Sequence, residues 1–268
     1  MPDRYPVLDH PGPIAFAHRG GAAEAPENSP RAFRHAVDLG YRYLETDLRA
    51  TRDGVCIAFH DATLSRTTDR EGTVRDLPWA DVRQARIHGT EPIPLFEELL
   101  EEYPDVRFNI DVKEAHSVGP FLQVLRRTGT VDRVLTTSFG GIRLDAVRRE
   151  VGPRLATALT PAEVARLFTA SRRRDRTRTR TSTREAGLRF RRPPGAAAAQ
   201  VPERVGPRRL VDRRFVHAAH RAGLQVHVWT VNDPAAMTRL LDLGVDGLMT
   251  DRPTQLREVL RERGQWVP

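Results

Sequence analysis

Apolar, β-branched runs alternate with helical patterns along almost the whole chain. Strands joined through helices lie parallel in one sheet, so this alternation predicts a parallel sheet covered by helices. Eight such units close into a barrel, and a (β/α)8 barrel takes about 250 residues. The chain has 268 residues. We therefore expect one α/β domain over residues 1–268, a (β/α)8 TIM barrel.

The expected elements follow from the apolar runs and from the turn residues between them. Barrel strands are expected at Ile14–His18, Tyr43–Leu48, Arg107–Val112, Val134–Ser138, Leu155–Leu159, Ala196–Val201, Gln225–Thr230 and Gly247–Thr250, and helices near 29–40, 95–102, 118–128, 141–150, 161–169, 212–222 and 234–243. After a further strand-like run at 55–60, residues 62–92 lack a strong period. They predict a small insertion after the second strand.

The basic charge of the chain is concentrated in one segment. Residues 172–192 hold ten arginines, one aspartate and one glutamate, which equals the whole net charge of +8. We expect 171–195 to form an Arg-rich irregular loop, because self-repulsion opposes regular structure. Clustered arginines also suggest nucleic-acid binding as an alternative function. The segment has one aromatic residue and the remaining chain is neutral, so no nucleic-acid partner is expected.

No stretch approaches the roughly 20 apolar residues of a membrane helix, so stable membrane insertion is not expected. The first 13 residues are polar and proline-rich, without the apolar core of a secretory signal. These features predict a soluble protein in the cytoplasm. Cys56 is the single cysteine, and its apolar neighbours indicate a buried strand position.

Polar residues at the carboxyl ends of barrel strands carry most weight, because active sites of this fold lie there. The first strand ends in His18 and Arg19, a proton-transfer group beside a bidentate phosphate binder. The second strand carries Glu45 and Asp47, which alternation places on one face. Two close carboxylates repel, and a divalent cation between them is the natural explanation. Solvated surface acids are the alternative.

Two later segments extend this pattern. His60 ends the strand-like run after the second strand and is expected near His18 as a second proton-transfer group. Asp111 and Lys113 end the following strand and share one face. Lys113 is the single lysine in a chain whose other basic residues are arginines, which marks it as a specific point charge.

Three further residues have two open interpretations each. Glu27 and Asn28 lie in the first strand-to-helix loop, either supporting the site or capping the next helix. Trp229 ends the seventh strand, where it either closes the mouth over substrate or fills core space. Four other polar residues are expected outside the site: His220, His227, Asp246 and Asp251.

Together these motifs resemble the glycerophosphodiester phosphodiesterase family. The matching motifs are His18-Arg-Gly, Glu27-Asn28, Glu45-x-Asp47, His60-Asp61, Asn109-Ile-Asp-Val-Lys113, Trp229-Thr-Val-Asn232 and Gly244-Val-Asp-Gly-x-x-Thr-Asp251-x-Pro253. The family usually has Glu where this chain has Asp111. The resemblance implies a hydrolase that releases glycerol 3-phosphate and an alcohol from a small glycerophosphodiester.

The resemblance also implies residue roles. A divalent cation, Mg²⁺ or Ca²⁺, would be held by Glu45, Asp47 and Asp111. His18 and His60 would be the catalytic acid and base, while Arg19 and Lys113 would hold the phosphate. Water and a hydroxyl of the substrate itself both remain possible nucleophiles.

A lysophospholipase D-like hydrolase of lipid diesters is the alternative within this fold. It requires an apolar patch or an amphipathic element near the mouth of the barrel. No such patch is evident in the sequence, although the insertion at 62–92 leaves room for one.

Overall fold

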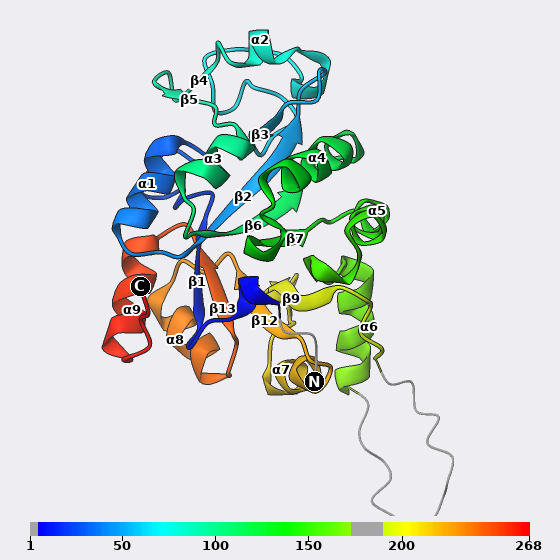
Figure 1. Ribbon diagram of the computed structural model, residues 1–268. Coiled ribbons are helices and arrows are strands. Elements are labelled where there is room, and N and C mark those ends of the chain that lie inside the picture. Colours follow the sequence, from blue (N-terminus) through cyan, green and yellow to red (C-terminus); the bar gives the residue numbers. More distant parts are fainter. Residues whose placement is uncertain (1–4, 173–189) are drawn as a thin grey trace, which may run out of the picture.

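The computed structural model describes residues 5–172 and 190–268, which form a closed barrel surrounded by helices (Figure 1). The eight parallel barrel strands are β1 (Ile14–His18), β2 (Tyr43–Ala50), β6 (Arg107–Val112), β7 (Val134–Thr137), β8 (Ala156–Ala158), β9 (Ala196–Pro202), β12 (Gln225–Trp229) and β13 (Gly247–Thr250). Each pairs with its neighbour, and β1 pairs with both β2 and β13, which closes the ring. The expected TIM barrel is confirmed.

Helices connect the strands and cover the outer face of the barrel. They are α1 (Pro30–Asp38), α3 (Phe96–Glu102), α4 (Val118–Thr128), α5 (Gly141–Val151), α6 (Pro161–Arg172), α7 (Arg213–Arg221), α8 (Pro234–Asp242) and α9 (Pro253–Glu262). Short 3-10 helices lie at Pro6–Leu8, Ala115–Ser117, Val131–Arg133 and Gly152–Arg154. None of the helices within residues 5–172 and 190–268 is long and apolar enough to cross a membrane.

The sequence located these elements well and missed one helix. The expected sixth strand, Ala196–Val201, forms as β9 between β8 and β12. Helix α9 was not predicted; it begins at Pro253, directly after β13. Of the expected Arg-rich loop at 171–195, residues 173–189 lie outside the described part of the chain, and 171–172 extend α6.

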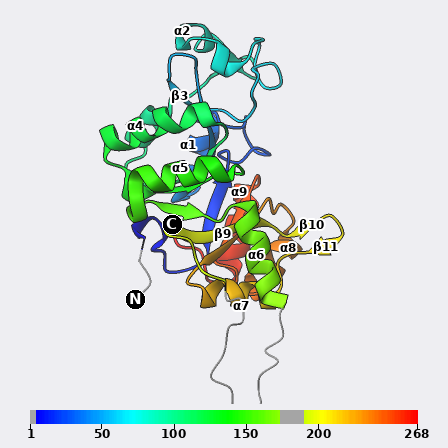
Figure 2. The same ribbon diagram turned by 90° about the vertical axis from the view of Figure 1, so that its right-hand side faces the viewer.

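The segment between β2 and α3 leaves the barrel and carries its own small core. It contains β3 (Cys56–Ala58), which pairs antiparallel with β2, a 3-10 helix (Val74–Asp76), α2 (Trp79–Val82), β4 (Arg86–Ile87) and β5 (Glu91–Pro92). Its apolar residues pack together, among them Phe59, Leu64 and Ile87. Both views place α2 at the opposite end of the molecule from α6 and α7 (Figures 1 and 2).

Strand alternation and register bring the polar residues to one end of the barrel. Phe16 and Tyr43 pack in the barrel interior, so the residues two positions further along each strand, His18 and Glu45, share that face. His18 is the register partner of Glu45, and Asp47 is the partner of Asp111 on the next strand. Four of the expected site residues are therefore fixed by backbone pairing.

Candidate active site

His18, at the end of β1, lies between two carboxylates. Its Nδ1 is 2.6 Å from Oδ1 of Asp251, and its Nε2 is 3.8 Å from Oε2 of Glu45. Asp251 is itself held by Asn232, whose Nδ2 donates to Oδ2 at 2.8 Å. Because Nδ1 faces a carboxylate, the ring is oriented with Nε2 toward the interior of the mouth.

The turn after β1 is tight because it approaches α1 closely. Arg19 has a φ of +52° and Gly20 a φ of +82°, both in the left-handed region. A Cβ on Gly20 would lie 2.7 Å from the Cβ of Ala32 in α1, so only glycine fits. This geometry directs the backbone N–H of Arg19 to Oε2 of Glu45, at 3.0 Å.

Asp47 is buried and surrounded by cationic and amide donors. Lys113 Nζ lies 2.7 Å from its Oδ1, and Arg19 Nε lies 3.0 Å from its Oδ2. The side-chain amide of Asn28 donates to the same Oδ2 at 3.2 Å and accepts from Thr46 at 2.7 Å. Asn28 therefore supports Asp47, while the capping of α1 is performed by Ser29 instead.

Asp111 shares the ammonium of Lys113 with Asp47, since Nζ donates to Oδ2 of Asp111 at 2.7 Å. Its other oxygen, Oδ1, is buried and has no hydrogen-bond partner within the described residues. Within residues 5–172 and 190–268, no three acidic, His or Cys residues are grouped closely enough to hold a metal ion as they stand.

Burial and charge shift the pKa values of these groups in different directions. Burial raises the pKa of Glu45 to about 7, although His18 opposes the shift. For Asp47, burial is outweighed by Lys113 and Arg19, which hold its pKa below the usual value. Burial lowers the pKa of His18, but Glu45 and the hydrogen bond to Asp251 outweigh it and leave that pKa raised. Burial raises the pKa of Asp111 despite Lys113.

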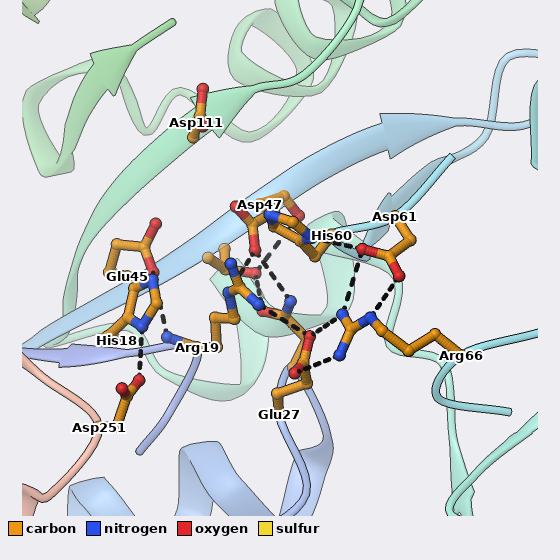
Figure 3. A network of polar contacts seen from close by, with 12 residues as sticks. His18, Arg19, Glu27, Glu45, Asp47, His60, Asp61, Arg66, Asp111 and Asp251 are labelled. Carbon is orange, nitrogen blue, oxygen red and sulfur yellow. Dashed lines mark hydrogen bonds and ion pairs between the residues drawn. The ribbon is translucent and has the colours of Figure 1, made fainter. Parts of the chain in front are cut away.

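His60 follows β3 and is also backed by a carboxylate. Its Nδ1 lies 2.5 Å from Oδ1 of Asp61, and Asp61 is held in turn by the guanidinium of Arg66 (Figure 3). The same guanidinium donates hydrogen bonds to Glu27, whose Oε1 also accepts one from Nη1 of Arg19 at 3.0 Å. His60 is thus connected to Arg19, in the turn after β1, through Asp61, Arg66 and Glu27.

One side of a cavity of about 700 Å³ is lined by the polar residues His18, Arg19, Glu45, Asp47, His60, Asp111 and Lys113. Its other side is mainly apolar and is formed by α6, β9 and the hairpin of β10 (Arg204–Val205) and β11 (Arg208–Arg209), whose Arg208 and Arg209 also line the cavity. We call this surface the apolar wall, which consists of Leu159, Pro161, Val164, Ala165, Phe168, Val201, Pro202, Val205 and Leu210. Trp229 also lines the cavity, and its ring meets the edge of Phe139 at a centroid distance of 5.7 Å.

All the expected catalytic, phosphate-binding and carboxylate residues reach this cavity, and Glu27 and Asn28 lie directly behind it. The expectation that Asp251 lies outside the site is wrong, because its carboxylate contacts His18. It follows the last strand, and that position was the signal available in the sequence. The apolar wall was also missed, because its residues come from α6, β9 and the hairpin.

Comparison with known families agrees with this arrangement. Residues 18–255 match the model of the glycerophosphoryl diester phosphodiesterase family. The chain belongs to this family. A relative from Mycobacterium tuberculosis, named probable glycerophosphodiester phosphodiesterase 2, is 39% identical over 97% of this chain and 95% of its own. A lysophospholipase D from Rattus norvegicus is 29% identical over 91% of this chain and 85% of its own.

Solved structures of the family share the fold. A glycerophosphodiester phosphodiesterase from Agrobacterium tumefaciens superposes with a TM-score of 0.74 at 21% identity, covering 93% of this chain and 99% of its own. An Oleispira antarctica phosphodiesterase, solved with sn-glycerol-3-phosphate as product, has a TM-score of 0.73 at 23% identity, covering 93% and 97%. Membership makes the chain an enzyme of the phosphoric diester hydrolase class.

Proposed function

We propose that the protein hydrolyses small glycerophosphodiesters to glycerol 3-phosphate and an alcohol, with a divalent cation and two histidines. The observation that carries the proposal is the matched support of His18 and His60. Each ring has its Nδ1 on a carboxylate, Asp251 or Asp61, and each lines the same cavity. Such a carboxylate fixes the tautomer and leaves Nε2 free to exchange a proton with substrate.

The two histidines divide the proton transfers. One removes the proton of the nucleophile, which is water or a hydroxyl of the substrate's own glycerol. The other protonates the departing alcohol, and each transfer contributes about 10² to 10⁴ in rate. Arg19 and Lys113 hold the phosphate, since both line the cavity beside the histidines. Trp229, on the same surface, covers the glycerol face.

The carboxylates suit a hard divalent cation, Mg²⁺ or Ca²⁺. Asp111 offers a buried oxygen that lacks a donor among the described residues, and burial raises the pKa of Glu45, so a cation beside this carboxyl would favour its ionised form. Glu45, Asp47 and Asp111 would hold the ion, with Asn28 and Glu27 supporting them. When bound, the cation supplies positive charge against the phosphate oxygens.

The test is release of glycerol 3-phosphate from glycerophosphocholine by the purified protein. Mg²⁺ or Ca²⁺ should support release, EDTA should stop it, and His18→Ala and His60→Ala should each slow it about 10²- to 10⁴-fold. His217→Ala, an exposed histidine on α7, is the matched control and should keep wild-type activity. Absence of release from every glycerophosphodiester tested, by a folded protein containing either cation, would refute the proposal.

A second candidate activity is hydrolysis of lipid diesters in which the glycerol carries an acyl chain. The apolar wall favours it, because a cavity of about 700 Å³ is large for a glycerophosphodiester alone and its lining is mainly apolar. Choline release from lysophosphatidylcholine, compared with release from glycerophosphocholine, tests this activity. A lower kcat/KM for the lipid substrate at every chain length would exclude it.

The cytoplasmic location expected from the sequence stays a prediction. Fractionation of cells that produce the protein tests it directly.

A further inference from the structure

Arg66 lies in the insertion after β3, outside the residues assigned to the reaction above, yet it joins two parts of the site. Its Nη1 donates to Oε2 of Glu27 at 3.0 Å, and its Nη2 donates to Oε1 of Glu27 at 2.6 Å. Its Nε donates to Oδ2 of Asp61, and Nη2 lies 3.2 Å from Oδ1 of the same carboxylate. One guanidinium thus bridges two carboxylates that are 34 positions apart in the chain.

Each of these carboxylates holds a different group of the site. Glu27 accepts from Nη1 of Arg19, whose Nε lies against Asp47. Asp61 lies 2.5 Å from Nδ1 of His60. Figure 3 shows Arg66 between the two, with one branch running to the phosphate-holding arginine and the other to the histidine. The contacts to Glu27 and to Asp61 are both made by the one planar guanidinium group of Arg66.

The electrostatics support two ionised carboxylates at this point. The hydrogen bond from Arg66 is the main reason why the pKa of Asp61 is lowered to about 2. Burial raises the pKa of Glu27, but Arg66 and Arg19 outweigh burial and leave that pKa lowered. The side chain of Arg66 is 48% exposed, so its removal leaves no buried cavity.

We propose that Arg66 is a positioning residue that sets the orientation of Arg19 through Glu27 and of His60 through Asp61. The insertion would thereby take part in catalysis without touching substrate. The inference rests on the proposed function, since it concerns the groups that hold and cleave the diester. A lysine at this position could not reproduce both contacts, because an ammonium lacks the planar fork.

The two branches predict different kinetic effects in the cation-loaded enzyme. Asp61→Asn should lower kcat about tenfold with little change in KM, because the histidine loses its orienting partner. Glu27→Gln should raise KM about tenfold with little change in kcat, because the arginine loses its support. Arg66→Ala should do both and reduce kcat/KM about 100-fold.

Double variants separate positioning from a general loss of structure. In the Arg66→Ala background, adding Asp61→Asn should lower kcat by less than about twofold, and adding Glu27→Gln should raise KM by less than about twofold. Added guanidinium at non-denaturing concentration should restore part of the activity of Arg66→Ala. Arg70→Ala, an exposed arginine of the same insertion outside this network, should behave as wild type.

The outcomes distinguish this inference from the function on which it rests. An inactive wild type refutes both. An active wild type with unchanged kcat and KM in Arg66→Ala refutes the positioning role alone. Fully additive effects in both double variants also refute it, since Arg66 would then act only on the stability of the insertion. If thermal melts show that Arg66→Ala is unfolded, Arg66→Lys in the same assays decides. Its kcat/KM should fall, but by less than about 100-fold, because an ammonium can keep only part of the contacts. A wild-type kcat/KM in Arg66→Lys would refute the positioning role.

Discussion

The two sides of the cavity are built in opposite ways. On the polar side, His18, Glu45, Asp47 and Asp111 stand on barrel strands whose register fixes their relative positions. The apolar wall comes instead from α6, β9 and a two-stranded hairpin, and its Val205 is 61% exposed. The polar side is held by buried ion pairs, whereas part of the apolar wall is open to solvent.

This difference indicates a division of labour. Groups that act on the phosphate need fixed geometry, and strand ends in a barrel supply it. The part of a diester that varies between substrates can be received by hydrocarbon surface, which discriminates by only about 1–3 kcal/mol per methylene. We therefore expect variants of the polar side to remove activity and variants of the apolar wall to redistribute it among substrates.

The largest expected effect is that of His18→Ala. Loss of a proton-transfer group should reduce kcat/KM for glycerophosphocholine about 10³-fold, within the range for general acid or base catalysis. Phe168→Ala on the apolar wall is the comparison variant and should stay within about threefold of wild type on this small substrate. Glycerol 3-phosphate release measures both. Similar losses in the two variants would remove the distinction between the sides.

Beneath the polar side, a buried histidine predicts acid sensitivity. Burial lowers the pKa of His227 from 6.5 to about 4. The unfolded chain takes up this proton below pH 6.5, while the folded protein does so only near pH 4. The contribution of His227 to the free energy of unfolding is therefore fully present above pH 6.5, and it falls by roughly 3 kcal/mol as the pH drops to about 4. Urea unfolding measured across this pH range should give a free energy of unfolding that changes less with pH in His227→Gln than in the wild type.

Binding of a divalent cation to the polar side should raise the free energy of unfolding by slightly less than the contribution of His227. At about 100 times its Kd, an ion that binds only the folded protein adds about 2.7 kcal/mol. Mg²⁺ or Ca²⁺ should accordingly raise Tm, and Asp111→Asn should reduce that rise by weakening binding. The same Tm shift in wild type and in a triple variant of Glu45, Asp47 and Asp111 would place the ion elsewhere.

The smallest expected effect belongs to the apolar wall. Val205→Asp introduces a charge on an exposed hairpin, so folding should be little affected. The ratio of kcat/KM for lysophosphatidylcholine to that for glycerophosphocholine should fall about tenfold. Val267→Asp, at another exposed valine far along the chain, is the matched control and should leave the ratio unchanged. An unchanged ratio in Val205→Asp would show that the wall does not receive an acyl chain.

The sequence predicted the polar side because local rules determine it. Alternation along a strand assigned Glu45 and Asp47 to one face, and the strand ends placed His18, His60 and Lys113 at one end of the barrel. The structure has each of them lining the cavity. The absence of other lysines marked Lys113, which now lies between two carboxylates.

The remaining features depend on tertiary contacts that no local rule reports. Asp251 follows the last strand, which places it at the mouth of the barrel, but its contact with His18 forms only across the β1 and β13 pairing. Arg66 was not singled out, since one arginine among many in an irregular insertion has no distinguishing spacing. The apolar wall joins residues between Leu159 and Leu210 that have no common period.

The pairing of the first barrel strand with the last has a consequence for synthesis. His18 and Asp251 are 233 positions apart, so the ribosome must add that many residues after His18 before the two can meet. Contacts of such long range form late, because closing a large loop costs entropy before any pairing is gained. A nascent or truncated chain that contains His18 but not yet Asp251 would therefore lack the aspartate that orients the histidine. Competence for hydrolysis would then arise only on completion of the ring.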